Sequence, residues 1–252
     1  MSAAVAPVLA MDGLFKAFGG VVATRDVSLD IRKGEIHALI GPNGAGKTTL
    51  ISQLFGALRP DRGRILLHDQ DITGLSPAQR ARRGISRSFQ ITALARSMSV
   101  LQNAVLAILA QDGHAFSFWR SIQRDAPLQA RAHELLRSVG MHGRAGALVE
   151  SLSHGEQRLL EFALAMAGDP AIVLLDEPMA GLGHEEGLEM TQHLARLKGK
   201  TTIILVEHDM DAVFGLADRV TVLVGGTVLA TGTPAEIRAN PDVRNAYLGD
   251  DL

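Results

Sequence analysis

One short stretch restricts the possible folds of this chain more than any other feature. It satisfies the phosphate-loop pattern G-x-x-x-x-G-K-[ST] and reads Gly41-Pro42-Asn43-Gly44-Ala45-Gly46-Lys47-Thr48-Thr49. Glycines let successive backbone N–H groups converge on phosphate oxygens, because no Cβ stands in the way. A helix that follows the loop adds the positive end of its dipole. The pattern assigns the β- and γ-phosphates to Lys47 and a Mg²⁺ ligand to the hydroxyl of Thr48.

The residues around the loop supply the strand and the helix that this motif requires. Glu35–Ile40 has the apolar character of a buried strand, and Thr49–Phe55 can continue as a helix. The alternative is a glycine-rich turn that matches by accident. At an average glycine frequency of about 7%, the fixed positions recur in roughly one per cent of chains of this length. The strand–loop–helix context makes an accident rarer still, so we predict a nucleotide site.

Composition excludes several classes of protein. The chain has 252 residues, enough for one large domain or one domain with an inserted lobe, and 46% are hydrophobic. A formal net charge of −2 gives no general attraction to nucleic acid or anionic lipid. With 0 Cys, disulfides, thiolate metal sites and cysteine nucleophiles are excluded. Ser2–Met11 lacks the basic start of a signal peptide, and no run of about 18 apolar residues occurs. We therefore expect the chain to reach a membrane only through a partner.

Strand-like stretches occur in the first and last thirds of the chain, and the middle has helical periodicity. We predict strands at Val8–Leu14, Asp26–Ile31, Glu35–Ile40, Gly63–Leu67, Ile85–Phe89, Ala171–Leu175, Thr201–Val206, Asp218–Val224 and Thr227–Thr231. We predict helices at Val100–Ala110, Gln129–Val139, Glu156–Ala167, Glu185–Lys198, Met210–Leu216 and, in two short pieces, within Pro234–Leu248. The sequence thus predicts an α/β domain with a helical lobe inserted from about residue 91 to residue 169.

A group of arginines lies in and after a short helix. Ser76 suits the N-cap of this helix and Pro77 its first position. The arginines that follow are Arg80, Arg82, Arg83 and Arg87. We predict a solvated basic face, with a docking surface for a partner as the alternative.

Polar residues follow several of the predicted strands, where ligands gather in an open α/β sheet. Asp176 is placed to hold Mg²⁺ beside Thr48, although a carboxylate there could simply cap a helix. Glu177 is placed to orient or deprotonate an attacking water, with a surface salt bridge as the alternative. His208 is predicted to contact the γ-phosphate and not to be a structural histidine. Gln90 could bridge metal and water.

Two further features lie outside these strand ends. Leu152–Gln157 contains Ser153 as a natural N-cap and Glu156 three residues later, which completes a capping box. Helix capping explains this turn on its own, but a helix N-terminus with Ser and Gly is also suited to a second phosphate. Phe18 precedes a Gly-Gly turn, where it either packs under the turn or offers an exposed ring for an adenine to stack on.

Taken together and in this order, these motifs resemble those of the ATP-binding cassette (ABC) ATPases over nearly the whole chain. The resemblance implies a P-loop NTPase fold with a mixed central sheet, N-terminal antiparallel strands and an inserted helical subdomain. It implies a RecA-like core over about 1–90 and 170–252, with the helical subdomain over about 91–169. It also implies ATP and Mg²⁺ as cofactors, with metal contacts at Thr48, Gln90 and Asp176.

The same resemblance implies how the site works. Two cassettes pair head to tail, so that Ser153 and Gly155 of one contact the γ-phosphate held by Lys47 of the other. The nucleotide contacts then include the whole signature turn, namely Ser153, His154, Gly155, Glu156 and Gln157. Phe18 is then the platform for the adenine ring, and Glu177 is the general base. His208 senses the γ-phosphate, and Gln90 reports the nucleotide state to a membrane subunit.

Two positions depart from the family pattern. His154 replaces the usual Gly of the signature turn, and Gly183 stands where the loop after the catalytic Glu usually carries Asp. We expect activity to survive the first change, because Ser153 and Gly155 are retained. We expect the second change to weaken the usual contact across the dimer.

Several short pieces resemble one subfamily in particular, the ATP-binding subunits of branched-chain amino acid importers. They are Phe18-Gly19-Gly20, Leu152–Gln157, Ala180-Gly181-Leu182, Glu207-His208-Asp209-Met210 and Ala246-Tyr247-Leu248-Gly249. This resemblance implies two membrane permeases and, indirectly, a solute-binding protein as partners, no nucleic acid, and a peripheral place on the cytoplasmic face of the inner membrane. The alternatives are the ATPase of an exporter or of a transporter for another solute, and a soluble ABC protein that acts on nucleic acid or the ribosome.

Overall fold

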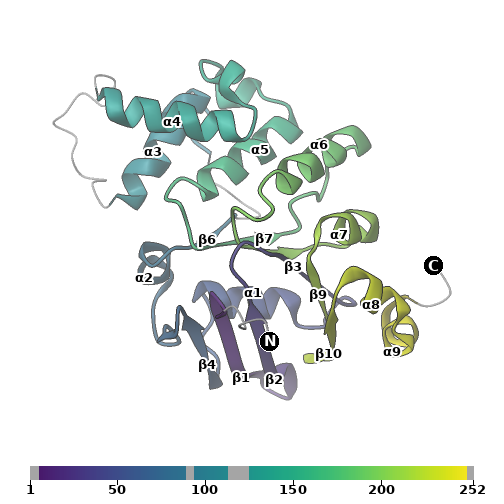
Figure 1. Cartoon of the computed structure of the whole chain (residues 1–252). Coiled ribbons are helices and arrows are strands. Elements are labelled where there is room, and N and C mark those ends of the chain that lie inside the picture. Colours follow the sequence, from purple (N-terminus) through teal and green to yellow (C-terminus); the bar gives the residue numbers. More distant parts are fainter. Residues whose placement is uncertain (1–5, 89–93, 113–124, 249–252) are drawn as a thin grey trace.

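The structure is a computed structural model that describes residues 6–88, 94–112 and 125–248 (Figure 1). The described strands form two sheets. One is four-stranded, in the order β2-β1-β4-β5, and the other is six-stranded, in the order β10-β9-β3-β8-β7-β6. These sheets confirm the predicted α/β class with antiparallel strands at the N-terminus.

The four-stranded sheet is antiparallel throughout. Its members are β1 (Leu9–Phe18), β2 (Val21–Ile31), β4 (Arg62–Leu67) and β5 (Gln70–Asp71). The first two strands are longer than the sequence predicted, because their pairing continues to Phe18 and Val21 at the Gly-Gly turn. Apolar residues on the inner face of this sheet pack on α1 (Lys47–Phe55), which shares one core with both sheets.

The six-stranded sheet is mixed, as predicted. Its strands are β3 (Ile36–Ile40), β6 (Ile85–Arg87), β7 (Ile172–Asp176), β8 (Ile203–Val206), β9 (Arg219–Val224) and β10 (Thr227–Gly232). β10 pairs antiparallel with β9, and every other pair is parallel. All residues of β3, β7 and β8 are buried, which explains their continuous apolar sequences. Because these strands are parallel, their carboxyl ends lie along one edge of the sheet.

The remaining helices lie around the sheets and above them. They are α2 (Pro77–Arg82), α3 (Val100–Gln111), α4 (Ala126–Ser138), α5 (His154–Ala165), α6 (His184–Ala195), α7 (Met210–Leu216), α8 (Pro234–Ala239) and α9 (Pro241–Val243). Short 3₁₀ turns occupy His142–Arg144 and Val149–Ser151, and a π turn occupies Arg244–Leu248.

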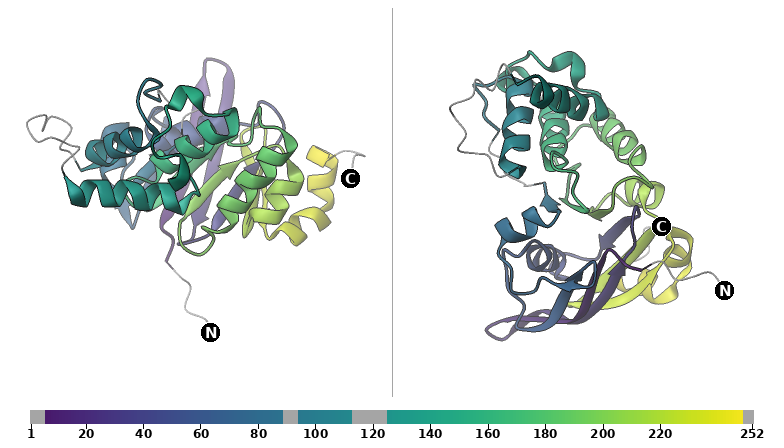
Figure 2. Two further views of the ribbon diagram at one scale, coloured as in Figure 1. Left: turned by 90° about the horizontal axis from the view of Figure 1, so that it is seen from above. Right: turned by 60° about the vertical axis from the view of Figure 1, so that its left-hand side comes forward.

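The middle of the chain is helical where the structure describes it. Helices α3, α4 and α5 lie together at the top of Figure 1, apart from the sheets, and the right-hand view of Figure 2 shows the same separation. They pack through one apolar core that continues to the buried residues of β7 and β8. Between residues 94 and 169, the described residues form helices and turns, with one isolated β-bridge between Ser99 and Leu148. The helical character predicted for this stretch is therefore confirmed.

Arg80 corrects one sequence prediction. It is fully buried, although we expected a solvated basic face. Its guanidinium donates to the carbonyl oxygens of Gln53 at 2.6 Å, Leu54 at 2.8 Å, Thr73 at 2.9 Å and Leu75 at 3.2 Å. Burial lowers the pKa of Arg80 to about 10. The physical reason is that carbonyl groups from the end of α1 and from the segment before α2 converge at this point, and the guanidinium supplies donors to both.

Candidate nucleotide site

Three of the four predicted strand ends meet at one edge of the six-stranded sheet. The phosphate loop follows β3, Asp176 ends β7, and His208 lies just beyond β8. Since β8 lies between β3 and β7 and pairs parallel with both, the three ends are neighbours. Gln90 lies outside the described residues, so its place in the site stays a prediction.

The phosphate loop has backbone angles that require glycine. Gly41 and Gly46 have φ of +150° and +101°, and a Cβ at either position would overlap the carbonyl oxygen of Leu223 or Ala23. Gly46 is the N-cap of α1, and no side chain caps this helix end within the described part of the chain. The backbone N–H groups in the first turn of α1 can therefore bind an anion, as a phosphate site requires.

Lys47 is buried and folded back onto its own loop. Its Nζ donates to the carbonyl oxygens of Gly41 at 2.5 Å and Pro42 at 3.1 Å. Burial lowers the pKa of Lys47, and the negative charges of Glu177 and Asp176 oppose that shift. Thr48, Asn43 and Gly44 are exposed, whereas Ala45 is buried and Thr49 half-buried. The lysine thus donates to neutral backbone carbonyls, which a charged phosphate oxygen can replace as the acceptor.

Asp176 has a partner that the sequence did not suggest. Its Oδ2 accepts a hydrogen bond from Nη2 of Arg87 at 2.9 Å. The Asp176 side chain is 3% exposed and that of Arg87 is 13% exposed. Arg87 comes from β6, which pairs parallel with β7, so the two side chains leave neighbouring strands. Arg87 is therefore not part of a solvated basic face, which corrects a second residue of the predicted arginine cluster.

The predicted base and the predicted phosphate sensor lie in direct contact. Nε2 of His208 is 2.9 Å from Oε1 of Glu177. Glu177 has a φ of +53°, in the left-handed region that residues other than glycine seldom adopt. Its backbone N–H donates to the carbonyl of Val206 at 2.8 Å, which fixes the turn beside β8. Both side chains remain partly exposed and accessible to water.

Glu207 is a site residue that the sequence reasoning missed. One carboxylate oxygen accepts the backbone N–H of Met179 at 2.8 Å, and the other accepts that of His208 at 3.0 Å. Burial raises the pKa of Glu207. The side chain ties the turn after Glu177 to the turn that carries His208. The sequence feature that could have identified Glu207 is its position at the end of a buried strand, next to His208.

The signature turn has the capping geometry that the sequence predicts. Ser153 is the N-cap of α5, and its Oγ accepts the N–H of Glu156 at 3.1 Å. The Glu156 carboxylate accepts the N–H of Ser153 at 2.9 Å in return. His154 is exposed at the first position of the helix, and Gln157 donates to the carbonyl of Leu152 at 3.1 Å. In the described part of the chain, no hydrogen bond joins this turn to the phosphate loop.

An anion of the same chain lies at the signature turn. Glu186, in the first turn of α6, accepts the backbone N–H of Gly155 at 3.1 Å and the hydroxyl of Ser153 at 3.4 Å. Its second oxygen accepts the N–H of Gly183, the N-cap of α6, at 3.3 Å. Gly183, which stands where the family pattern has Asp, thus provides a backbone donor, and Glu186 is the carboxylate that accepts from it.

Phe18 is exposed at the end of β1. Its side chain is not packed under the turn, since 51% of the residue is accessible. Nζ of Lys16 lies 5.7 Å from the ring centroid and is held by Asp61 at 2.7 Å. The ring is therefore available for stacking, and its role toward adenine stays a prediction.

A family model for the ABC transporter matches residues 24–180, which is more than half of the chain. The chain belongs to the ABC transporter ATP-binding family. A second model, described as branched-chain amino acid ATP-binding cassette transporter, matches residues 227–252. As a member of this family the chain is a nucleotide-binding ATPase.

Curated relatives span the chain almost completely. A "High-affinity branched-chain amino acid transport ATP-binding protein LivG" of Salmonella typhimurium is 44% identical over 253 residues, which cover 97% of this chain and 98% of the relative. The corresponding BraF protein of Pseudomonas aeruginosa is 38% identical over 254 residues, with 97% and 98% covered. The chain is therefore homologous to ATP-binding subunits of branched-chain amino acid transport systems.

Solved structures share the fold. A nucleotide-free ATP-binding cassette from an ABC transporter has a TM-score of 0.84 at 28% identity and covers 97% of this chain and 100% of its own. The ADP conformation of such a cassette also has a TM-score of 0.84, at 29% identity, with 97% and 99% covered. The predicted ABC cassette fold is confirmed. In the ranges that the structure describes, no helix has the length and apolarity needed to span a membrane.

Proposed function

We propose that this chain hydrolyses ATP to drive an importer for branched-chain amino acids or related amino acids and amides. One observation carries the hydrolytic half of the proposal. The Glu177 carboxylate lies 2.9 Å from a ring nitrogen of His208, at the same sheet edge as the phosphate loop. A carboxylate held there can orient and deprotonate a water beside the γ-phosphate. The two relatives that are branched-chain amino acid transport ATP-binding proteins support the choice of solute.

In the proposed reaction the phosphate loop and Lys47 bind the β- and γ-phosphates. Thr48, Asp176 and Gln90 would hold Mg²⁺, which neutralises phosphate charge when bound. The donor set fits this ion, because Mg²⁺ in nucleotide sites takes one or two carboxylates together with phosphates and waters. Among the described residues, no group of three or more His, Cys, Asp or Glu side chains could hold a metal ion. Glu177 acts as the general base.

His208 positions the Glu177 carboxylate and contacts the γ-phosphate in this proposal. Phe18 stacks on the adenine through its exposed ring.

A second cassette completes each site. Ser153 and Gly155 lie at the N-terminus of α5 and have no hydrogen bond to the described residues of their own phosphate loop, which supports a role toward the ATP of a neighbour. The partner is a second copy or a homologous subunit. Hydrolysis should then rise more than linearly with protein concentration. Strict linearity, with a monomer in sedimentation, would argue against a shared site.

Further parts of the proposal concern the membrane. The partners are two permeases and, through them, a solute-binding protein, and the chain lies on the cytoplasmic face of the inner membrane. We also propose that the single ABC ATPase domain divides into a RecA-like core, about 1–90 and 170–252, and a helical subdomain, about 91–169.

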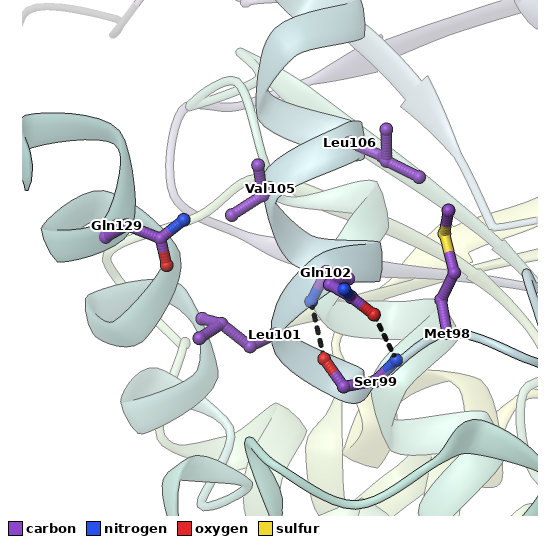
Figure 3. Close-up of a pocket in the computed structure, with 7 residues that line it drawn as sticks. All are labelled: Met98, Ser99, Leu101, Gln102, Val105, Leu106 and Gln129. Atoms are coloured by element: carbon purple, nitrogen blue, oxygen red, sulfur yellow. Dashed lines mark hydrogen bonds between the residues drawn. The ribbon is translucent and has the colours of Figure 1, made fainter. Parts of the chain in front are cut away.

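A hollow of about 380 Å³ on α3 is where we place a permease segment (Figure 3). Met98 and Leu106 expose 38% and 40% of their surface there. Two carboxamides, those of Gln102 and Gln129, border the same hollow. An apolar surface with polar groups at its border suits a short amphipathic helix. The sequence between β6 and α3 contains Gln90, so a contact here would lie close in the chain to the predicted reporter residue.

The test is uptake by proteoliposomes that contain the chain, its co-purifying permeases and their receptor. We expect ATP enclosed with the chain to drive leucine uptake, and Glu177→Gln to abolish it. ATP-driven release of a substrate, with no uptake, would favour the second candidate, an exporter. One relative supports that candidate: a "Lipopolysaccharide export system ATP-binding protein LptB" of Acidithiobacillus ferridurans is 37% identical over 246 residues. Hydrolysis stimulated by ribosomes or nucleic acid would contradict both.

A further inference from the structure

We propose that Arg87 is a positioning residue for the metal carboxylate: it holds one oxygen of Asp176 so that the other faces the nucleotide-bound Mg²⁺. This inference rests on the proposed function, in which Asp176 holds that ion. Neither the phosphate-loop motif nor the strand-end pattern assigns a role to Arg87.

The pair is built into the sheet. Nη2 of Arg87 donates to Oδ2 of Asp176 at 2.9 Å across the parallel strands β6 and β7. The backbone of β6 is fixed at this point, because the N–H of Ser88 donates to the carbonyl of Leu174 at 3.0 Å. Arg87 itself pairs in register with Leu174, two residues before Asp176. The geometry of the ion pair is thus set by the main chain of two adjacent strands.

The limited exposure of both side chains makes Arg87 the residue that orients Asp176. A carboxylate that is 3% exposed has little access to water, so its orientation is set by the side chain that donates to it. Among the described residues Arg87 is the side chain that donates to Asp176, and it bonds one oxygen only. The other oxygen, Oδ1, has no donor from a described residue. With Oδ2 held by Arg87, the carboxylate is fixed in orientation and Oδ1 stays available to a ligand.

Arg87 also bears an unusual feature for a simple structural pair. Its Nε is buried and has no hydrogen-bond partner in the described part of the chain. Leaving a buried donor unpaired costs stability. The site thus retains an arginine that satisfies Asp176 while part of its own guanidinium stays unsatisfied. This arrangement indicates that Arg87 orients the Asp176 carboxylate, and that satisfying its own guanidinium is not its main role.

Among the described residues, Arg87 donates to Asp176 and makes no hydrogen bond to the phosphate loop, where Lys47 donates to Gly41 and Pro42. Loss of Arg87 should therefore leave binding of free ATP unchanged and weaken binding of the divalent ion. This separation distinguishes positioning of the metal carboxylate from support of the nucleotide site as a whole.

The experiment measures Mn²⁺ as a probe by electron paramagnetic resonance, with ADP present so that no turnover occurs. We expect Arg87→Met to weaken Mn²⁺ binding roughly 10- to 100-fold, the range for a hydrogen bond to a charged group, while ADP affinity in EDTA stays as in the wild type. Arg87→Lys, which keeps the charge but lacks the planar guanidinium that directs Nη2 at Asp176, should give an intermediate loss. Arg83→Met removes an exposed arginine nearby and should bind Mn²⁺ as the wild type does.

The outcomes separate this inference from the proposed function. If the wild type fails to bind Mn²⁺ with ADP, the metal site itself is wrong. If the wild type binds and both Arg87 variants bind equally well, only the role of Arg87 is wrong. If the ADP affinity in EDTA falls together with the Mn²⁺ affinity in both variants, Arg87 supports the fold of the site and the inference is overturned. Arg87→Lys keeps the test decisive should Arg87→Met fold poorly.

Discussion

The Glu186 carboxylate accepts the backbone N–H of Gly155 at 3.1 Å. The same oxygen accepts the Ser153 hydroxyl at 3.4 Å, so an anion from α6 holds two donors at the N-terminus of α5. The proposed dimer assigns both donors to the γ-phosphate of an ATP bound by the second cassette. The Glu186 carboxylate and a γ-phosphate cannot both accept from these donors, because two negative charges at one site repel each other. Glu186 must therefore turn away when the dimer closes.

Glu186→Gln should favour the ATP-bound dimer. The neutral amide removes the repulsion of the incoming phosphate, and we expect dimers at a several-fold lower protein concentration. Sedimentation with ATP, in a Glu177→Gln background that prevents turnover, measures the effect. Glu185→Gln is the matched control, because Glu185 is exposed in the same helical turn and makes no contact with Ser153 or Gly155. Equal dimerisation of the two variants would show that Glu186 only caps α6.

Lys47→Ala should weaken ATP binding roughly 10- to 100-fold, the loss expected for a charge-assisted hydrogen bond to phosphate. The lysine already has its Nζ inside the loop, on the carbonyls of Gly41 and Pro42. A calorimetric titration with ATP measures the change, and the exposed Lys33→Ala serves as the control. Unchanged affinity in Lys47→Ala would contradict the assignment of the phosphate loop.

Glu207 should make stability depend on pH in a defined direction. Burial raises its pKa above the ordinary value of 4.5, so just above pH 4.5 the folded protein binds more protons at this site than the unfolded chain. Stability contributed by this residue is thus fully present below 4.5 and is lost as pH rises through the folded pKa.

Glu207→Gln cannot ionise and should lack this loss. The stability of the wild type relative to Glu207→Gln should therefore decline as pH rises from about 4.5, and become constant once Glu207 is ionised in both states. Urea unfolding of both proteins over a series of pH values measures the difference, with Glu185→Gln as the control. A difference that grows in favour of the wild type over that range would have the wrong sign.

Arg80→Met should destabilise the fold by about 3 kcal/mol, because it removes the guanidinium donors from carbonyl groups at the end of α1 and in the segment before α2. Arg82→Met removes an exposed arginine from the same helix and should change stability by no more than about 0.5 kcal/mol. Urea unfolding of the two variants gives the comparison. Equal stability of Arg80→Met and the wild type would mean that water replaces the guanidinium at those carbonyls.

Local features of this protein could be predicted from its sequence. The phosphate loop with β3 and α1 depends on glycine geometry and on apolar runs a few residues long. The N-cap at Ser76 and the capping box at Ser153 depend on residues at most three positions apart. The ends of parallel strands also predicted that Asp176, Glu177 and His208 would gather at one sheet edge.

Contacts between distant segments could not be predicted in this way. Arg87 reaches Asp176 across 89 positions, and Glu186 reaches Gly155 across 31. Both pairs depend on which elements become neighbours, and neither periodicity nor propensity contains that information. Arg80 was misassigned for the same reason, because its partners lie at the end of a helix formed much earlier in the chain.

Glu177→Gln tests the central claim most directly, because it removes only the proposed base. With ATP and Mg²⁺ we expect near wild-type ATP affinity, hydrolysis slower by roughly 100- to 10,000-fold, and a dimer in sedimentation that disperses when ATP is removed. Comparing the ATP affinity with the hydrolysis rate separates binding from chemistry, since the glutamine amide can still contact His208. Hydrolysis within about twofold of the wild-type rate would contradict the assignment of Glu177 as the base and with it the proposed mechanism.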